Sequence, residues 1–329
     1  MNKFYCSIKA IESSFPKNFE TNNKLKLDNP EWNIEEIEKK TGISKRWISS
    51  SNETAVDLAF NACENILFKV DLNTIDTLIL VTQSPDYFLP TSACILHEKL
   101  SLNKNTKCFD INLGCSGFVY GLSIATSFIQ SNLSDNVLLV CADTYTKFID
   151  NNDRTNRPIF SDAATATLIS RSEEANIGPF LFGTNGKGYS NLIVKEGAAK
   201  SGFICNNSSQ PTLHMDGSDV FMFTMSEIPK NVNDIIAISE IEKDSIDMFI
   251  FHQASKIVLD KLQSKLSIPN EKFYSNLKLI GNTVSSTIPL ALKDASDNLK
   301  IQASNIILIS GFGVGLSWGS CLIKWNDLI

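Results

Sequence analysis

Short runs of apolar, often β-branched residues alternate along the chain with segments in which apolar residues recur at helical spacing. Several runs are apolar almost throughout, which is typical of strands buried on both faces between layers of helices. The predicted strands cover residues 77–82, 108–112, 136–142, 166–170, 246–251 and 305–310. The predicted helices cover residues 54–68, 116–130, 255–266 and 288–299. This alternation predicts an α/β fold with a largely parallel sheet.

A polar stretch at residues 172–178 divides the chain nearly in half. Each half contains strand–helix–strand units that end in a glycine-rich segment, a pattern that is consistent with internal duplication, although residue identity between the halves is weak. We therefore expect two similar halves, residues 1–172 and 173–329, packed into one body.

Composition narrows the class of protein. The chain is 43% hydrophobic and 20% charged with a net charge of −6, which is typical of a globular protein and argues against a basic nucleic-acid groove. It contains no run of about 18 apolar residues that would span a membrane. Lys3 and Lys9 interrupt the N-terminal segment, which lacks the apolar core of a signal peptide. We therefore expect a cytoplasmic protein that binds neither nucleic acid nor membranes.

The eight cysteines include no CxxC pair, and the chain has only three histidines, so no structural zinc site is expected. Cysteines in a reducing compartment are usually free, buried thiols. Cys115 differs because it stands where a predicted strand meets a predicted helix, and the helix dipole and unpaired N–H groups there favour a thiolate with a lowered pKa. Gly114 and Gly117 flank it and permit a tight turn and the close approach of a substrate. This context favours a nucleophile, with a buried structural cysteine as the alternative.

Two further side chains occupy positions suited to a ligand site. His252 follows the predicted strand 246–251, at the strand end where open α/β sheets bind ligands, and Asn282 precedes a predicted helix. Each alone has an ordinary structural explanation, as a hydrogen-bonded core histidine or as a turn asparagine. Together with Cys115 they could perform acyl transfer, because a thiolate accepts an acyl group while His Nε2 and the Asn amide donate to an oxyanion.

The glycine-rich segment 311–319 is no dinucleotide-binding loop, because only 14 residues follow Gly315 and leave no room for a helix and strand. A turn there could instead present the N–H of Gly313 to an oxyanion. Residues 183–188 lack the spacing of a phosphate-binding loop and are expected to form an ordinary loop.

Four segments resemble β-ketoacyl-acyl carrier protein synthase III, a thiolase-fold condensing enzyme, and occur in the same order. They read DINLGCSGFVYG at 110–121, HQA at 252–254, GNTVSSTIPLAL at 281–292 and GFGVGLSWG at 311–319. Shorter similarities around Lys40, Arg154 and Phe160 and at 215–221 extend the resemblance over nearly the whole chain. It implies a thiolase-like α/β fold with two similar halves in a layered α-β-α-β-α body and mixed, largely parallel sheets.

The resemblance also implies a reaction. An acyl group would pass from acyl-CoA, or from an acyl carrier protein, to Cys115 and then condense with a malonyl thioester, with malonyl-acyl carrier protein as the expected partner, releasing CO₂ and free CoA. His252 and Asn282 would bind the malonyl carbonyl and stabilise the enolate, while the N–H groups of Cys115 and Gly313 would form the oxyanion hole. The family implies no tightly bound cofactor, since the coenzyme A thioester is a substrate.

Substrate contacts follow from the same resemblance. Lys40 and Phe160 lie in matched segments, and Arg154 falls on the position that stacks on the adenine of coenzyme A. Leu89 matches a residue, often Phe, that closes the acyl pocket across a dimer interface. Because this residue would act across the interface, we predict a homodimer. Because Leu is smaller than Phe, we also predict that the acyl pocket accepts a primer longer or bulkier than acetyl.

Two positions depart from the family and concern its partners. The family has a Trp shortly before an Arg, whereas Trp32 lies eight positions before Lys40, so the clamp on coenzyme A is expected to differ. The Arg that helps to dock the carrier protein is missing after 252–254, where Lys256 could compensate or the carrier could differ. A specialised relative from a secondary or surface-glycan pathway is therefore as consistent with the sequence as a fatty-acid initiator.

Three other interpretations share some of these sequence features. A papain-like protease has a similar Cys-to-His spacing but a different Cys context, which is absent here. A non-catalytic dimer partner of the same fold would have no need of Cys115. A non-decarboxylating acyltransferase of the same fold, which passes the acyl group to a hydroxyl or amine, remains an alternative.

Overall fold

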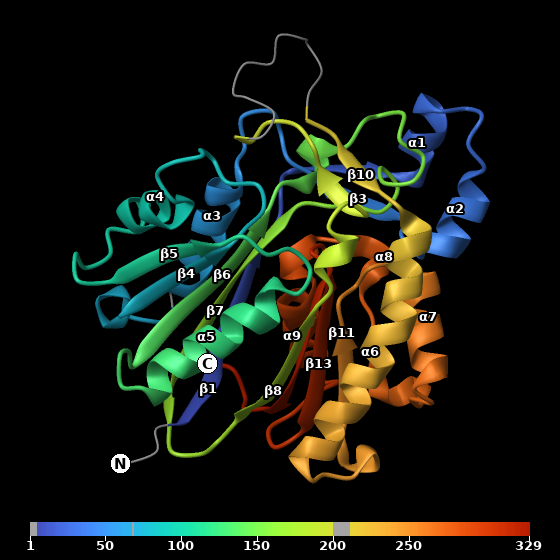
Figure 1. Cartoon of the computed structure of the whole chain (residues 1–329). Coiled ribbons are helices and arrows are strands. Elements are labelled where there is room, and N and C mark those ends of the chain that lie inside the picture. The colour runs from blue at the N-terminus through green and yellow to red at the C-terminus, as the bar shows by residue number, and fades with distance from the viewer. Residues whose placement is uncertain (1–4, 68, 200–210) are drawn as a thin grey trace.

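Two mixed sheets of five strands each form the centre of the molecule in the computed structural model, which describes residues 5–67, 69–199 and 211–329 (Figure 1). The first sheet has the order β1–β7–β6–β4–β5. Its strands are β1 (Tyr5–Ser14), β4 (Thr77–Val81), β5 (Lys107–Ile111), β6 (Asn136–Asp143) and β7 (Ala163–Ser172). The second sheet has the order β12–β11–β13–β14–β8. Its strands are β8 (Ile177–Thr184), β11 (Met248–Phe251), β12 (Phe273–Tyr274), β13 (Ile306–Gly313) and β14 (Ser317–Lys324).

The two sheets share one topology. With the strands of each sheet numbered in chain order, both sheets have the order first–fifth–fourth–second–third. In both, the fifth strand pairs antiparallel with the first and the fourth, while the second pairs parallel with the third and the fourth. Equivalent connections contain α3 (Ala55–Leu67), α4 (Ser92–Lys99) and α5 (Gly117–Gln130) in the first half, and α6 (Gly217–Ser239), α7 (Lys256–Lys265) and α9 (Thr287–Asp297) in the second. Such equivalence is what an internal duplication would produce.

The helices and sheets stack in five layers. α5 and α9 lie between the sheets and contact strands of both, α3 and α4 cover the outer face of the first sheet, and α6 covers that of the second, with α7 packed against α6 (Figure 1). One apolar cluster fills the central layer and two others fill the spaces under the outer helices. The predicted α-β-α-β-α arrangement is therefore confirmed.

The predicted strands and helices are all present, with ends that differ by a few residues. Half of the neighbouring pairs in the two sheets are antiparallel, a larger share than the sequence pattern indicated. Most of these pairs involve β1, β8 or β14, which the sequence pattern did not predict because polar residues and glycines break their apolar runs. The predicted turn at 311–319 is a hairpin, since β13 continues through Gly313 and β14 begins at Ser317.

Smaller elements lie around one end of the two sheets, toward the top of Figure 1. They are β2 (Asn18–Thr21), α1 (Asn22–Asp28), α2 (Ile34–Thr41), β3 (Lys45–Ile48), β9 (Leu192–Val194), β10 (Leu213–Met215) and α8 (Leu277–Ile280). Within the described residues, no helix is long and apolar enough to span a bilayer. The seven cysteines described there are free thiols, and Cys205 lies outside those residues.

Candidate active site

Cys115 lies in the tight turn between β5 and α5, with 6% of its surface exposed. Its side chain faces the end of β13, where a Cβ built on Gly313 would lie 2.8 Å from the Cβ of Cys115 and 2.9 Å from its Sγ. No real Cβ approaches so closely, so only glycine fits beside this thiol. The turn after β13 also directs the N–H of Val314 toward the sulfur, and this contact helps to stabilise a thiolate.

The prediction that the helix N-terminus lowers the pKa of Cys115 is wrong. Burial raises the pKa of this thiol to about 12, and the nearby carboxylate of Asp143 raises it further. The N–H groups of Cys115 and Val314 act in the opposite direction but are outweighed, because loss of hydration disfavours a thiolate more than two N–H groups stabilise it. Cys115 is therefore a neutral thiol at rest.

The glycines beside Cys115 are packed against protein rather than open to a substrate. A Cβ on Gly114 would lie 2.5 Å from Gln83 Oε1, and one on Gly117 would lie 2.4 Å from Val81 Cγ1. Their role is thus to let the turn pack closely on the residues at the end of β4, and the predicted role in substrate approach does not apply.

His252 follows β11 and is buried with a hydrogen bond of 2.7 Å between Nδ1 and Thr287 Oγ1. The Thr287 hydroxyl donates to the backbone carbonyl of Val284 at 3.0 Å. Because a hydroxyl has a single hydrogen, it must accept from Nδ1–H of His252, which leaves the lone pair on Nε2. Burial also lowers the pKa of His252 to about 3, so the ring is neutral. In this state Nε2 accepts a hydrogen bond, and it can donate one only after gaining a proton.

Asn282 is held by its backbone and by one end of its side chain. Its N–H donates to Ile159 O at 3.0 Å, and its carbonyl accepts from Ser161 N at 2.9 Å. The side-chain Oδ1 accepts from Val284 N at 3.0 Å. That bond assigns the amide orientation, so Nδ2 remains as the donor available to a ligand.

Val284 therefore organises both polar side chains of the site. Its N–H orients Asn282, and its carbonyl orients His252 through Thr287. Val284 has a φ of 56°, in the left-handed region that β-branched residues rarely adopt. Such strain persists where the surrounding structure imposes it, and here it is located where two functional groups are positioned.

The repeated topology explains why distant residues meet. Cys115 precedes α5 and Asn282 precedes α9, which are the equivalent helices of the two halves, and both helices lie in the central layer. His252 lies 137 positions after Cys115 in the sequence and 30 before Asn282. The three side chains line one cavity of about 1030 Å³.

This cavity also receives several other predicted residues. Gly313 and Phe160 line its inner part, and Lys40 on α2 lines the outer part, where its ammonium pairs with Glu36 at 2.7 Å. Arg154 is exposed and lines an adjoining depression that shares Lys40 with the cavity. A continuous surface thus leads from the two cationic side chains to the thiol.

Three residues singled out in the sequence lie elsewhere. Lys256 pairs with Asp260 at 2.6 Å and lines a separate depression. Leu89 is 82% exposed and is not among the residues that line the cavity of its own chain. Trp32 is buried in a small cluster with apolar residues of α1 and α2 and does not line the cavity that contains Cys115.

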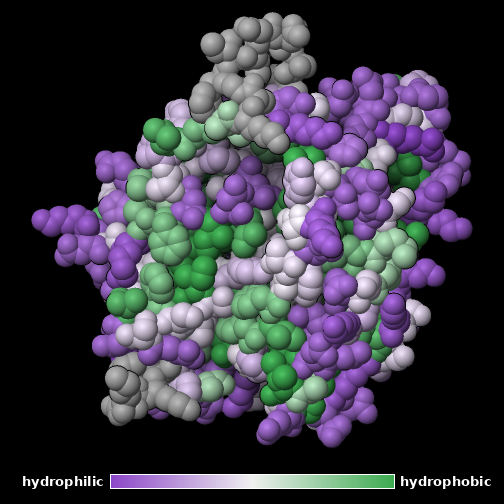
Figure 2. Space-filling model, viewed as in Figure 1, coloured by the Kyte–Doolittle hydropathy of each residue, from purple (hydrophilic) through white to green (hydrophobic). Residues whose placement is uncertain are grey.

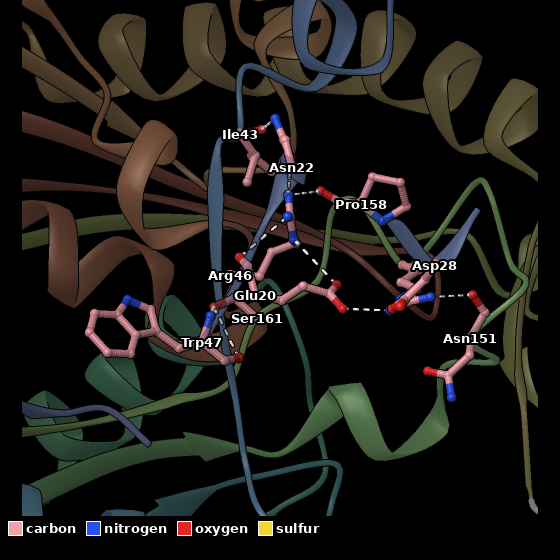
Figure 3. A network of polar contacts seen from close by, with 10 residues as sticks. Glu20, Asn22, Asp28, Ile43, Arg46, Trp47, Asn151, Pro158 and Ser161 are labelled. Carbon is pink, nitrogen blue, oxygen red and sulfur yellow. Dashed lines mark hydrogen bonds and ion pairs between the residues drawn. The ribbon is translucent and has the colours of Figure 1, made fainter. Parts of the chain in front are cut away.

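A polar network supports the loop that carries Phe160 and pairs with Asn282. Arg46 is fully buried and donates from Nη1 to Asn22 Oδ1 at 2.7 Å and to Pro158 O at 3.4 Å (Figure 3). Arg157 contacts Glu20 at 2.5 Å. The network ties β2, α1 and β3 to the loop before β7, so these two arginines have a structural role.

Sequence reasoning missed four residues close to the chemistry. Thr287 lies inside a matched segment, but nothing local showed that its hydroxyl meets His252. Val314 also lies inside a matched segment, but nothing local showed that its N–H reaches the sulfur of Cys115. Tyr145 and Gln83 carried no signal, because their proximity to the turn that holds Cys115 arises only in the fold. In the described part of the chain, no group of three or more His, Cys, Asp or Glu could hold a metal ion.

The chain was compared with known families and structures. A family profile described as 3-oxoacyl-[acyl-carrier-protein] synthase III matches residues 109–186, and one described as its C-terminal part matches residues 236–325. Beta-ketoacyl-[acyl-carrier-protein] synthase III of Campylobacter jejuni (serotype O:23/36, strain 81-176) is 34% identical, over 97% of this chain and 98% of its own.

Two solved structures show the same fold. A structure of 3-oxoacyl-(acyl-carrier-protein) synthase III has a TM-score of 0.94 at 38% identity and covers 98% of this chain and 100% of its own. The priming beta-ketosynthase from the R1128 polyketide biosynthetic pathway has a TM-score of 0.92 at 26% identity and covers 100% of this chain and 98% of its own. The predicted thiolase-like fold is therefore confirmed.

Proposed function

The chain belongs to the 3-oxoacyl-acyl carrier protein synthase III family, and we propose that it condenses an acyl thioester with a malonyl thioester. The acyl group comes from acyl-CoA or an acyl carrier protein, and malonyl-acyl carrier protein is the second substrate. The products are a 3-oxoacyl thioester, CO₂ and free CoA. The observation that carries the proposal is the cavity lined jointly by Cys115, His252 and Asn282.

In the first half-reaction the Cys115 sulfur attacks the thioester carbonyl. Thiol and imidazole are both neutral at rest, so the proton moves from Sγ to His252 Nε2 as the carbon–sulfur bond forms rather than beforehand. The tetrahedral oxyanion accepts hydrogen bonds from the N–H groups of Cys115 and Gly313. It then collapses and expels the CoA thiolate, which leaves an acyl-enzyme and a protonated His252.

In the second half-reaction the malonyl carboxylate leaves as CO₂, and its bonding electrons form an enolate. The enolate oxygen accepts hydrogen bonds from Asn282 Nδ2 and from the Nε2–H that His252 gained in the first step. The enolate carbon attacks the acyl carbonyl on Cys115. The thiolate that departs recovers the proton from His252, so the site returns to its starting state.

The substrate arm approaches through the outer cavity. The exposed Arg154 stacks on the adenine of coenzyme A, and Lys40 lies where a phosphate would pass. Phe160 borders the inner channel. Lys256, on the exposed surface of α7, contributes to docking of the acidic carrier protein.

The active species is a homodimer. β5 is an edge strand of the first sheet, and its Phe109 and Ile111 are only partly buried. Figure 2 shows apolar side chains gathered on the face where β5 and α5 lie. An apolar edge strand is readily covered by the same strand of a second copy. The exposed Leu89 would then reach the acyl site of the partner.

One experiment tests the proposal directly. The protein is incubated with acyl-CoA and its intact mass is measured, and malonyl-acyl carrier protein labelled at the carboxyl carbon is then added. The expected result is one acyl group on Cys115, none on the Cys115→Ala variant, and release of labelled CO₂ together with a 3-oxoacyl carrier protein. An acyl-enzyme that passes its acyl group to a hydroxyl or amine without releasing CO₂ would contradict condensation.

A further inference from the structure

Two cysteines outside the active site lie side by side. The Sγ atoms of Cys94, on α4, and Cys108, on β5, are 3.7 Å apart, and neither residue lines the cavity that contains Cys115. We propose that this pair is a site of reversible oxidation, at which a disulfide forms between Cys94 and Cys108 when the surrounding thiol–disulfide balance becomes oxidising. The inference goes beyond the condensing function and does not depend on it.

The carboxylate of Asp110 fixes the geometry of the pair. It accepts hydrogen bonds from Ser92 N and Ala93 N, both at 2.7 Å, and so anchors the first turn of α4 to β5, which lie together in Figure 1. Side chains two positions apart in a strand point to the same face, so Cys108 faces the helix that Asp110 holds. Cys94 follows Ala93 in that first turn. A polar contact that involves no sulfur therefore brings the two thiols together.

A covalent bond between the two sulfurs requires only a local change. A disulfide bond is about 2.05 Å long, so the Sγ atoms have to approach each other by less than the width of one atom. Rotation about the Cα–Cβ bonds supplies such a movement, and the exposed side chain of Cys94 has room to rotate. No element of the fold has to move.

Reagents in solution reach this pair before they reach the nucleophile. Cys94 is exposed and Cys108 is partly exposed, whereas the other five thiols of the described residues, Cys115 among them, are buried. Burial also raises the pKa of Cys115 to about 12, so its reactive thiolate is scarce. The exposed pair is therefore the first thiol site that an oxidant meets.

The pair also lies apart from the apolar surface of β5 that faces the central layer. Phe109 and Ile111 pack against the central apolar cluster, whereas Cys108 packs against the cluster under the outer helices. Pairing of β5 with a second copy would use the backbone groups at the edge of the strand, and Cys94 lies on the helix that covers the outer face. The site is thus complete within one chain.

The oxidation balances with a low-molecular-weight disulfide such as oxidised glutathione. The Cys94 thiolate attacks one sulfur of the oxidant, so a bond forms to Cys94 and one glutathione thiolate leaves. The Cys108 sulfur then attacks the sulfur of Cys94 and expels the second glutathione thiolate. The protons of the two protein thiols end on the two glutathione thiolates. One glutathione disulfide is reduced as the protein pair is oxidised, and excess external thiol reverses both steps.

The environment of Cys108 sets the order of the two steps. Burial, and then the neighbouring Cys94, raise the pKa of Cys108 to about 11, so its thiolate is scarce while both thiols are free. Once Cys94 carries glutathione, its sulfur cannot ionise, and its contribution to the raised pKa of Cys108 is lost. The first step thus favours the second, which is intramolecular because the sulfurs are adjacent.

The disulfide should leave the active site intact. Asp110 already holds α4 on β5, so the new bond joins two elements that are in place. The pair can therefore consume an oxidant at the outer face of the first sheet while Cys115 remains a free thiol.

The test exposes reduced, full-length protein to oxidised glutathione and follows its intact mass. Wild type is expected to lose the mass of two hydrogen atoms, and peptide mapping without reduction should find the Cys94 and Cys108 peptides joined. A thiol reductant should restore the starting mass. Cys108→Ser should instead retain one glutathione on Cys94, because no second thiol displaces it. Cys63→Ala is the matched control, since it removes a fully buried thiol from α3, which packs against α4, and it should form the same disulfide as wild type.

Several results would overturn the proposal without requiring any variant to fold. They are a wild-type protein that stays unmodified, one that keeps glutathione on Cys94, and one that forms a disulfide between two copies. Acyl-CoA is then added to the oxidised wild type, which should acylate Cys115 at the rate of the reduced protein. A slower rate that a reductant restores would show that the bond disturbs the active site. If neither form is acylated, the condensing function fails, while the mass and the peptide map still decide the disulfide.

Discussion

Replacing Thr287 with Val tests how the structure prepares His252 for catalysis. Valine has nearly the shape of threonine, so the packing at the start of α9 is retained while the hydroxyl is lost. That hydroxyl joins His252 Nδ1 at 2.7 Å to Val284 O at 3.0 Å. The substitution leaves both buried groups without this partner.

The magnitude follows from these two bonds. A buried polar group left unsatisfied costs about 1–3 kcal/mol, so the loss of a partner by two such groups should lower the free energy of unfolding by about 2–6 kcal/mol. Catalysis should suffer separately. Without an acceptor at Nδ1 the ring no longer favours the tautomer with a lone pair on Nε2, and loss of a positioned base typically slows a step by about 10²–10⁴-fold. Thr287→Ser retains the hydroxyl and should stay near wild type in acylation rate.

Nuclear magnetic resonance of ¹⁵N-histidine provides the specific readout. The chain has only three histidines, and His252→Asn identifies the signal of His252. In wild type this signal should show a protonated Nδ1 and an unprotonated Nε2 throughout pH 5–8, because the pKa of His252 lies at about 3. In Thr287→Val the proton should redistribute between the two nitrogens.

Three results would refute the reasoning. A wild-type His252 protonated at Nε2 would mean that the Thr287 hydroxyl donates to the ring and that the assigned tautomer is wrong. A Thr287→Val protein with an altered ring signal but an unchanged rate of Cys115 acylation would mean that the Nε2 lone pair takes no part in the first half-reaction. If Thr287→Val loses stability but keeps the wild-type ring signal and acylation rate, the role of Thr287 is purely structural.

Four further predictions follow from the same geometry. Iodoacetamide at neutral pH should label the exposed Cys94 before Cys115. The labelling rate of Cys115 should rise about tenfold per pH unit as the pH approaches its pKa of about 12. Peptide mapping that finds Cys115 labelled first at pH 7 would contradict the raised pKa. His252→Ala and Asn282→Ala should each slow decarboxylation and condensation by about 10²–10³-fold, and Asn282→Ala should leave the acylation of Cys115 nearly intact. Release of radiolabelled CO₂ measures the decarboxylation step, and intact mass measures the acylation step. Condensation at a near wild-type rate in both variants would show that the two side chains do not have their assigned role. Gly313→Ala places a methyl group 2.9 Å from the Sγ of Cys115 and should slow acylation by about 10²-fold or more. Gly186→Ala is the control, because its methyl group would meet nothing within 4 Å. Equal acylation rates in the two variants would show that β13 shifts easily to accommodate the methyl group. The pKa of His252 falls from its usual value of 6.5 to about 3 on folding, so the unfolded chain binds more protons than the folded chain between those two pH values. The free energy of unfolding should therefore decrease as the pH is lowered from 6.5 toward 3, by at most about 1.4 kcal/mol per pH unit from this group. Chemical denaturation of His252→Asn should show a shallower decrease.

The parts of the fold that were predictable are those whose local pattern matches their final environment. β4, β6 and β11 are buried on both faces, so their residues are apolar almost throughout and identify them without reference to any partner. The helices α5 and α9 were found because their apolar residues repeat at helical spacing. β8 and β14 escaped because their residues are mixed, and only pairing with each other and with β13 makes them strands.

The candidate site divides in the same way. The sequence by itself determined which residue types stand at the ends of β5 and β11 and before α9, and together with the resemblance to the synthase III family that information was enough to single out Cys115, His252 and Asn282. The tertiary structure alone decided the chemical state of these groups. The pKa of Cys115 rises rather than falls because the thiol is buried against distant segments, such as Gly313 at the end of β13, and because the carboxylate of Asp143 in β6 lies nearby. The tautomer of His252 depends on a hydroxyl 35 positions away. Burial and hydrogen bonding between distant segments are properties of the folded chain, and no local pattern of residues contains them.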